Sequence, residues 1–285
     1  MKVAICCIVK MENLYLRDWV KYYYDMGIKN IILYDNNDIN GEYPQQVIGD
    51  FIANDFVIYK NARGKYRFQI EAYQQCYDEY RHDFDWMGFL DIDEYWYLSP
   101  EYTIDGFFSE ERLPNAYGVF VNWLCYGDNN NLFYENKPVY ERFKIPTHPL
   151  TFTDKNGGEV NKIKKMFLKC TDDMYFVIDE VDDVTYYTDL EEFNAYMANG
   201  EIYDYNKTTH EVSVIKHYRT LTIEEFLYRR FGRRGYADKS SSYNYDEIMN
   251  VFWSQNMWTQ EKQNIIDDFF NNFEVIEDNI CNDDK

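Results

Sequence analysis

Glycine, proline and basic side chains are all scarce in this sequence. It has 13 glycines and six prolines in 285 residues, whereas 46% of its residues are hydrophobic. That balance excludes a disordered or low-complexity chain and predicts a sizeable core. Acidic residues outnumber basic ones by 50 to 29, which gives a net charge of −21. Such a field repels phosphate backbones, so no nucleic acid partner is expected.

Several familiar motifs are absent as well. Neither G-x-x-x-x-G-K nor G-x-G-x-x-G occurs, which argues against P-loop and Rossmann cofactors. The spacing of the six cysteines fits neither a zinc site nor a compact disulfide framework. We therefore expect the cysteines to be reduced thiols. Reduced thiols are typical of cytoplasmic proteins, so a cytoplasmic location is expected. The apolar run over residues 3–9 is too short for a signal peptide, and no run reaches transmembrane length.

Strands and helices alternate along the first hundred residues. Apolar and β-rich runs predict strands over residues 3–9, 30–37, 56–61 and 86–93, and helical periodicity predicts helices over 11–27, 43–55 and 66–83. Gly27 is expected to end the first helix. The alternation predicts an α/β fold with a mostly parallel central sheet and helices on both faces.

The pattern becomes looser after about residue 100. Further strands are predicted over residues 117–127, 162–170, 174–179 and 210–219. Thr222 and Glu225 have the spacing of a capping box, and helices are expected after Thr222 and over residues 244–273. We therefore expect a main domain over residues 1–240 and a helical C-terminal extension with an acidic tail over residues 241–285.

Polar residues follow three of the predicted parallel strands, at residues 10–12, 35–36 and 91–93. Because such strands end at the same edge of the sheet, a polar cleft is expected there. Asp91 and Asp93 would share one face of an extended strand, and Glu94 would point away. Two adjacent carboxylates repel unless a cation lies between them, and Mg²⁺ or Mn²⁺ suits oxygen ligands and substrate phosphates. The alternative is a solvated acidic turn after a core strand.

Two other groups are candidates for the same chemistry. His217 lies at the end of a predicted strand, where it is either a metal ligand or a structural histidine. Four arginines occur within six residues, and their like charges at helical spacing destabilise each other unless an anion such as phosphate binds. They are Arg229, Arg230, Arg233 and Arg234. The alternative for these arginines is pairing with the surrounding acids.

Taken in order, segments of residues 3–238 resemble bacterial glycosyltransferases of the GT-A fold, in particular the family 2-like and family 92-like group. The matching segments are "CIVKMENLYLRDWVKYYYDMGIKNIILYDNND", "FQIEAYQQCYDEYR", "WMGFLDIDEYW", "VNWLCYGDNNN", "PVYERF" and "IKHYRTLTIEEFLYRRFGRRG". Met11 is a departure, because the family usually has Lys-Asn-Glu where this chain has Lys-Met-Glu.

The resemblance implies a GT-A-like fold and transfer of a sugar from a nucleoside diphosphate donor, with a UDP-sugar as the first choice. The expected cofactor is Mn²⁺ or Mg²⁺, and the expected acceptor is a glycan or lipid-linked glycan in surface polysaccharide synthesis. The resemblance assigns nucleotide contacts to Val9, Lys10, Glu12, Asp35, Asn36 and Asp91, metal ligation to Asp91, Asp93 and His217, and diphosphate contacts to Lys165 and Arg234.

An inverting transfer also requires a carboxylate that deprotonates the acceptor hydroxyl. Asp128 is preferred because it directly follows the strand over residues 117–127. Glu141 is the second candidate, although Glu141 can instead pair with Arg142 or another base. A sugar nucleotidyltransferase and a non-enzymatic carbohydrate-binding protein are the alternative functions. The protein is expected in the cytoplasm, either free or peripheral at the inner membrane face, and the sequence leaves its oligomeric state open.

Overall fold

The computed structural model describes residues 1–147, 163–172, 194–204, 206–232 and 245–280. The chain divides into two compact units. Unit 1 consists of Met1–Leu124 and Val160–His217, and unit 2 of Cys125–Glu159 and Tyr218–Lys285. The predicted domain boundary at residue 240 lies outside the described residues, as does the predicted strand over residues 174–179.

Unit 1 is built around a mixed β-sheet with the strand order β3-β2-β1-β4-β7-β6-β9-β5, and β8 pairs with β6. Its strands are β1 (Val3–Val9), β2 (Asn30–Asp35), β3 (Val57–Asn61), β4 (Trp86–Phe89), β5 (Glu94–Leu98), β6 (Gly118–Cys125), β7 (Lys164–Lys169), β8 (Ala195–Met197) and β9 (Ser213–His217). The four strands from β3 to β4 are mutually parallel, and β8 is parallel to β6. The pairs β4–β7, β6–β7 and β5–β9 are antiparallel.

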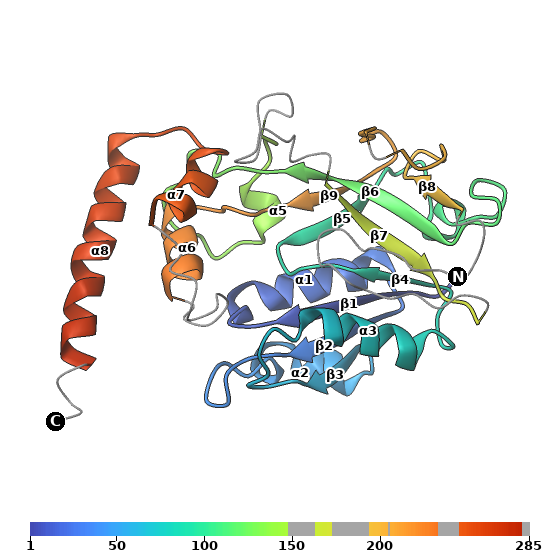
Figure 1. The fold of residues 1–285 in the computed structure, drawn as a ribbon, viewed down its shortest axis with the longest axis horizontal. Coiled ribbons are helices and arrows are strands. Elements are labelled where there is room, and N and C mark those ends of the chain that lie inside the picture. Colours follow the sequence, from blue (N-terminus) through green and yellow to red (C-terminus); the bar gives the residue numbers. More distant parts are fainter. Residues whose placement is uncertain (148–162, 173–193, 205, 233–244, 281–285) are drawn as a thin grey trace. The chain divides into compact units, whose positions relative to one another are not determined.

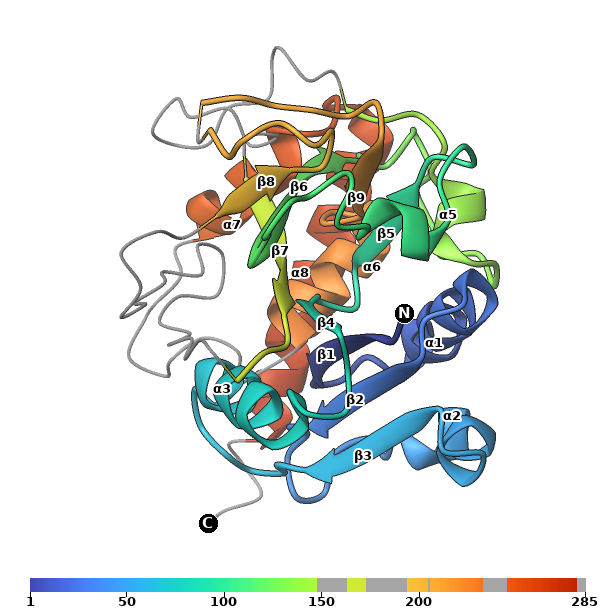
Figure 2. The same ribbon diagram turned by 90° about the vertical axis from the view of Figure 1, so that its right-hand side faces the viewer.

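Helices cover both faces of the parallel part of the sheet. Helices α1 (Asn13–Met26) and α2 (Gln45–Ala53) lie on one face, and α3 (Gln69–Tyr80) lies on the other (Figures 1 and 2). A short helix, α4 (Ile104–Phe107), follows β5. The predicted α/β class, with a central sheet flanked by helices, is confirmed.

The sequence pattern explains why these elements form. Every residue of β1 is buried, as a continuous apolar run requires in a parallel strand covered on both faces. On α1 the buried side chains recur at helical spacing and include Leu16, Trp19 and Tyr23. Gly27 ends α1 as predicted, with a φ of 91°, a conformation that glycine adopts without a steric penalty.

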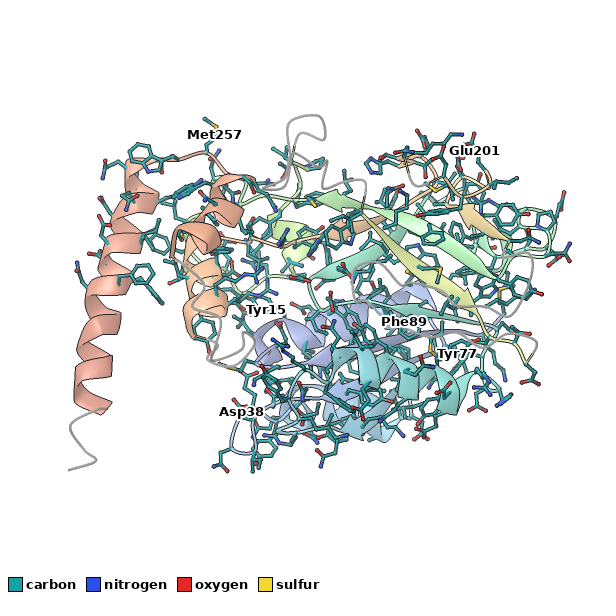
Figure 3. All side chains as sticks on the ribbon, viewed as in Figure 1. Tyr15, Asp38, Tyr77, Phe89, Glu201 and Met257 are labelled. Carbon is teal, nitrogen blue, oxygen red and sulfur yellow. The ribbon has the colours of Figure 1, made fainter. Side chains whose placement is uncertain are left out.

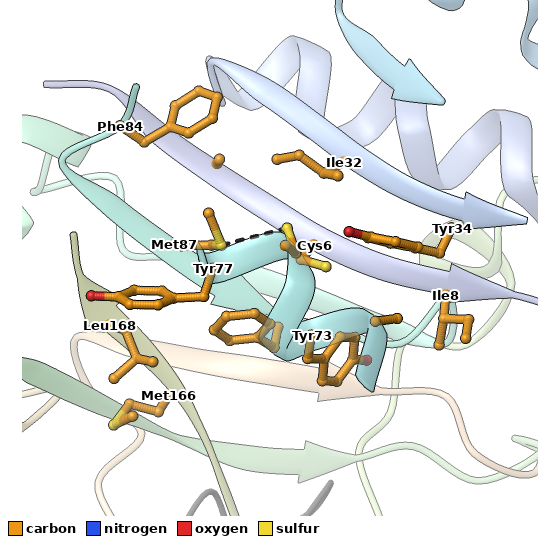
Figure 4. Close-up of a cluster of buried hydrophobic side chains, with 14 of the residues drawn as sticks. Cys6, Ile8, Ile32, Tyr34, Tyr73, Tyr77, Phe84, Met87, Met166 and Leu168 are labelled. Carbon is orange, nitrogen blue, oxygen red and sulfur yellow. Dashed lines mark hydrogen bonds between the residues drawn. The ribbon is translucent and has the colours of Figure 1, made fainter. Parts of the chain in front are cut away.

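One apolar core cluster of unit 1 lies between the sheet and α3. Figure 4 shows Tyr73 and Tyr77 of α3 packed with Cys6 and Met87 from the neighbouring strands β1 and β4. Tyr77 and Phe89, both labelled in Figure 3, are inside this unit, whereas the Asp38 side chain is 59% exposed. The polar edge and the apolar core are therefore distinct parts of unit 1.

Unit 2 is mainly helical. It contains α5 (Val139–Arg142), α6 (Ile223–Leu227), a π-helical turn (Tyr228–Gly232), α7 (Tyr245–Trp253) and α8 (Gln260–Ile280). The capping box predicted for Thr222 and Glu225 is present, since both reciprocal hydrogen bonds form. Phe226, Phe252 and Ile266 help to form its apolar cluster. The helices predicted near the C-terminus are confirmed, and among the described residues no helix has the length and apolar character needed to cross a membrane.

The predicted strand over residues 86–93 is wrong at its C-terminal end. Strand β4 ends at Phe89, residues 92–93 form a turn, and β5 begins at Glu94. The alternation of apolar and acidic residues is typical of an extended strand, but residues 92–93 form a turn instead. Asp91 and Asp93 are consequently placed by a tight turn rather than by the period of a strand.

Candidate active site

The carboxyl ends of three parallel strands meet at one edge of the sheet, as predicted. In the pairing of β1 with β2, Val9 is opposite Asp35, and in the pairing of β1 with β4, Cys6 is opposite Phe89. The segments that follow Val9, Asp35 and Phe89 therefore leave the sheet at the same edge. This is where an open α/β sheet binds its ligands.

The turn between β4 and β5 is fixed by Glu94. The backbone N–H of Asp91 donates to Glu94 Oε2 at 3.0 Å, and the N–H of Glu94 donates to the carbonyl of Asp91 at 3.0 Å. Trp19 Nε1 and the Tyr23 hydroxyl, both on α1, donate to the carbonyl of Glu94 at 2.8 and 3.0 Å. Glu94, predicted to point away from the face shared by Asp91 and Asp93, is fully buried, and its carboxylate is bonded to the backbone of Asp91.

The Asp91 carboxylate accepts bonds at both oxygens. Gln69 Nε2 donates to Oδ1 at 3.0 Å, and the Tyr73 hydroxyl donates to Oδ1 at 3.3 Å. Lys165 Nζ lies 3.2 Å from Oδ2 of Asp91 and 3.4 Å from Oε2 of Glu94. The Lys165 side chain is 3% exposed, whereas that of Asp91 is 31% exposed. Asp91 is therefore a partly exposed carboxylate that contacts a buried ammonium group.

Burial raises the pKa of the Glu94 carboxyl well above its usual range. Lys165 opposes this rise because its positive charge favours the carboxylate, whereas the charges of Asp91 and Asp93 add to it. Asp91 and Glu94 both contact the Lys165 ammonium, and the charge of Asp93 acts on Glu94 as well. An additional cation at this turn would relieve the excess negative charge.

Asp93 faces His217 across the β5–β9 pair. His217 Nε2 lies 3.6 Å from Asp93 Oδ1, and the two side chains are 7% and 17% exposed. The His217 ring also packs on Trp123 of β6, with 4.2 Å between ring centroids. A carboxylate oxygen and an imidazole nitrogen this close are a suitable pair of ligands for a divalent cation.

Within the described parts of the chain, no group of three or more His, Cys, Asp and Glu side chains is arranged to hold a metal ion. Asp91 is directed to Lys165, so Asp93 and His217 stand as a pair. Mg²⁺ and Mn²⁺ usually take one or two protein carboxylates and complete their shells with water and substrate phosphates. The Asp93–His217 pair fits such a partial shell, and metal ligation by Asp91, Asp93 and His217 stays a prediction.

Asp35 has a different environment. Its carboxylate accepts four hydrogen bonds, from the backbone and side-chain nitrogens of Asn37, from Tyr59 and from Arg63. Arg63 Nη1 lies 2.8 Å from Oδ2, and the Asp35 side chain is fully buried. Arg63 also donates to the carbonyls of Asp38 and Glu42. Asp35 thereby fixes the loop after β2 to the loop after β3.

The other predicted nucleotide contacts lie along the same edge. Val9 and Glu12 are buried, and the Lys10 ammonium lies 2.9 Å from the carboxylate of Asp38. The Asn36 side-chain amide donates to the carbonyls of Ala62 and Lys65 at 2.8 and 2.9 Å. These side chains shape the edge, and their contacts with a nucleotide stay predictions.

Comparison with protein families places this chain in one of them. The model of glycosyltransferase family 92 matches residues 2–244. The chain belongs to glycosyltransferase family 92. The resemblance to this family that the motifs indicated is therefore confirmed.

Curated relatives that match this chain include proteins from plants. A family 92 protein of Arabidopsis thaliana is 22% identical over 127 residues, and one of Ricinus communis is 24% identical over 127 residues. Each match covers 45% of this chain and 22% of the plant protein, so this family 92 chain spans only a fraction of the length of those relatives. The expected bacterial origin stays a prediction.

Among solved structures, TarS of S. aureus is similar to this chain. For residues 1–349 of TarS the identity is 9% and the TM-score 0.43, with 80% of this chain and 63% of that chain covered. The TarS structure in complex with UDP-GlcNAc has 10% identity and a TM-score of 0.36, with 64% of this chain and 51% of that chain covered.

In unit 2 of this family 92 chain, the two predicted catalytic bases differ in exposure. Asp128 is 3% exposed, and its carboxylate pairs with Lys262 of α8. Its Oδ1 also accepts the backbone N–H of Asn130 at 2.9 Å. Glu141 is exposed on α5. The predicted alternative of pairing between Glu141 and Arg142 is not what forms, because both terminal nitrogens of Arg142 bind a buried carboxylate, that of Glu225.

Several residues around the site were not singled out in the sequence. Gln69 and Tyr73 lie four residues apart on α3, so a helix that follows β3 presents both on one face to Asp91. Trp19 and Tyr23 have the same spacing on α1. Polar atoms on otherwise apolar helix faces are the signal that identifies such residues. Arg234, the second predicted diphosphate contact, lies outside the described residues.

Proposed function

We propose that this family 92 chain transfers a sugar from a nucleoside diphosphate donor to a hydroxyl of a glycan acceptor. The observation that carries this proposal is the Asp91–Asp93 turn, which lies at the carboxyl edge of the parallel strands with Lys165 and His217 beside it. Membership of the family supports the reaction class. A cationic and acidic cluster at this edge suits a metal-bound diphosphate.

The donor's nucleotide would lie along the carboxyl ends of β1 and β2. In this proposal, Val9, Lys10, Glu12 and Asn36 form its surroundings. Asp35 acts mainly by fixing the loops that carry Asn37 and Arg63, since its carboxylate already accepts four bonds from protein groups. The UDP-sugar class is our first choice of donor.

The diphosphate would be held at the Asp91–Asp93 turn. Asp93 and His217, together with Asp91, would ligate Mn²⁺ or Mg²⁺. When bound, such an ion stabilises the charge that develops on the leaving diphosphate. Lys165 supplies a buried ammonium 3.2 Å from Asp91 and adds positive charge at the same place. The enzyme's contribution is then positioning and charge stabilisation.

In an inverting transfer, Asp128 and Glu141 are the candidate bases in unit 2. Asp128 would have to exchange its pairing with Lys262 before it accepts a proton, whereas Glu141 is exposed. Comparison of Asp128→Asn with Glu141→Gln separates the two, because only loss of the true base lowers kcat while leaving donor affinity intact. A role in surface polysaccharide synthesis and a cytoplasmic location accompany this proposal as predictions.

Calorimetric titration of UDP with and without Mn²⁺ tests the proposal. We expect UDP affinity to depend on Mn²⁺ in the wild-type protein and to be lost in Asp93→Ala. Asp25→Ala is the matched control, because Asp25 is a surface acid of α1 whose side chain is 58% exposed and pairs with Lys21. Hydrolysis assays over a panel of sugar nucleotides then identify the donor.

Absence of UDP binding, or equal UDP binding without Mn²⁺, contradicts the metal-dependent transferase. Loss of binding in Asp25→Ala as well as in Asp93→Ala would mean that the variants report general damage to unit 1. If Asp25→Ala keeps UDP binding and Asp93→Ala loses it, the loss is assigned to the Asp91–Asp93 turn.

A further inference from the structure

Lys165 has two acidic partners within one turn of chain. Its ammonium lies 3.2 Å from Asp91 Oδ2 and 3.4 Å from Glu94 Oε2. The side chain is 3% exposed, and Glu94 is fully buried. A lysine ammonium is a compact charge on a flexible stem with three donors, so it can shift between acceptors that are close together.

Asp91 cannot keep this arrangement and also ligate a divalent cation. Its Oδ1 is held by two neutral donors, Gln69 and Tyr73, whereas the partner of Oδ2 is a cation. A divalent ion at Oδ2 and an ammonium at contact distance from the same oxygen repel each other strongly at a partly buried site. The ion and Lys165 therefore compete for one carboxylate oxygen.

We propose that Lys165 is the resting counter-ion of Asp91, and that binding of the metal-bound donor moves its ammonium from Asp91 to Glu94 and the donor's phosphate oxygens. This inference rests on the proposed function. It gives Lys165 a specific role. Lys165 competes with the metal ion alone for Asp91, and it strengthens binding of the metal-bound diphosphate.

Glu94 lowers the electrostatic cost of moving the Lys165 ammonium away from Asp91. A buried charge that loses its only partner is strongly destabilised, by about 3–5 kcal/mol in typical proteins. Lys165 avoids that state because Glu94 is within reach when Asp91 is taken by the metal. Glu94 itself is held in place by the backbone N–H of Asp91, so the second acceptor does not move with the first.

The adjacent residue of β7 provides a matched control. Side chains alternate between the faces of a strand, so Lys164 points to the opposite face from Lys165. Lys164 is 7% exposed, and its ammonium lies 5.8 Å from the ring centroid of Tyr203. A Lys164→Met variant thus removes an equally buried ammonium from the same strand without touching Asp91.

Calorimetry with Mn²⁺ alone and with Mn²⁺ plus UDP tests the inference in Lys165→Met, Lys164→Met and wild type. In Lys165→Met we expect the affinity for Mn²⁺ alone to rise about 10-fold and the affinity for UDP in the presence of Mn²⁺ to fall about 10-fold, in the usual range of coupling between sites. Lys164→Met should match the wild type in both titrations.

Lys165→Met leaves the buried Glu94 and the partly exposed Asp91 without their shared cation, so its folding is checked by its melting temperature. The double variant Lys165→Met/Glu94→Gln removes the ammonium together with its buried acidic partner and serves as the second test. Mn²⁺ alone should raise the Tm of both variants more than that of the wild type, because in both Asp91 is open to the metal.

An unchanged or weaker affinity for Mn²⁺ alone in both Lys165 variants overturns the inference and makes Lys165 a fixed ion-pair partner. If the wild type still binds UDP only with Mn²⁺ in that case, the proposed function stands. A wild-type protein that binds UDP equally well without Mn²⁺ contradicts the metal-dependent function, and the inference about Lys165 fails with it.

Discussion

Asp35 and Asp91 occupy equivalent places in the sheet but have opposite surroundings. Asp35 closes β2 and Asp91 follows β4, and both strands pair with β1. The Asp35 side chain is fully buried and surrounded by protein donors, including Arg63. Asp91 is 31% exposed, and its charged partner Lys165 is also within 3.4 Å of Glu94. Asp35 is bonded to donors on the loops beside it, whereas Asp91 shares its cation, Lys165, with Glu94.

Under the proposed function, this difference separates an acid that fixes the backbone from acids that bind the metal ion on the same edge. Arg63, in the loop after β3, donates to the carbonyls of Asp38 and Glu42 in the loop after β2, so loss of Asp35 affects both loops. The Asp91–Asp93 turn instead carries an excess of negative charge that a ligand cation can satisfy. We therefore expect substitutions at Asp35 to act on stability and substitutions at Asp93 to act on binding.

The largest stability effect is expected for Asp35→Ala. It leaves the Arg63 guanidinium, whose side chain is 11% exposed, without its carboxylate, and should lower the free energy of unfolding by about 3–5 kcal/mol in urea denaturation. Asp50→Ala is the control, since Asp50 makes the same kind of contact to Arg17 at the surface. Equal losses in the two variants would contradict a special structural role for Asp35.

The largest binding effect is expected for Asp93→Asn. This change keeps the size of the side chain but removes its charge next to His217. Loss of a metal ligand should lower Mn²⁺ affinity in the presence of UDP by at least about 100-fold, since even second-sphere changes cost up to that much. Urea denaturation should show little change in stability. A large loss of stability with unchanged Mn²⁺ affinity would instead make Asp93 a structural acid like Asp35.

A smaller effect is expected where α1 holds the turn. Tyr23→Phe removes a hydroxyl that donates to the carbonyl of Glu94 and accepts the N–H of Trp96 at 2.7 Å. The N–H of Trp96 is buried, so its lost bond should lower stability by about 1–3 kcal/mol. Tyr24→Phe, at a residue that is 51% exposed, should leave the unfolding midpoint unchanged. Equal midpoints for the two variants would mean that the tyrosine does not anchor the turn.

The smallest effect is a pH dependence near the antiparallel half of the sheet. Burial lowers the pKa of His210, whose Nε2 lies 3.0 Å from the carbonyl of Trp123. The unfolded chain binds a proton near its usual pKa of about 6.5, before the folded chain does, so stability should fall as pH drops below that value. His210→Gln should flatten this slope in urea denaturation at pH 5–7. An unchanged slope would assign the acid sensitivity to other groups.

Much of the fold was predictable because it depends on local pattern. The apolar run of β1 and the helical spacing of α1, with Gly27 at its end, are each specified by neighbouring residues. The end of β4 was not predictable in this way. Leu90 and Ile92 alternate with acids as in a strand, and the turn depends on Glu94 and on Trp19, which is 75 residues away in the sequence.

The site was predictable in its residue types and less so in its contacts. Strand order alone brings the segments after β1, β2 and β4 to one edge. His217 lies 3.6 Å from Asp93, and their ligation of a metal stays a prediction. The pairing of Asp128 with Lys262 joins residues from distant parts of the chain, and no local pattern in the sequence indicates it. The same holds for the contact of Lys165 with both Asp91 and Glu94.

Electron paramagnetic resonance of Mn²⁺ in the presence of UDP tests the central comparison most directly, because bound Mn²⁺ loses the sharp signal of the free ion. Wild type, Asp35→Asn and Asp93→Asn are titrated at a temperature at which all three are folded. We expect wild type and Asp35→Asn to remove the signal of free Mn²⁺ and Asp93→Asn to leave it in place. Loss of binding in Asp35→Asn together with retention in Asp93→Asn would contradict this expectation.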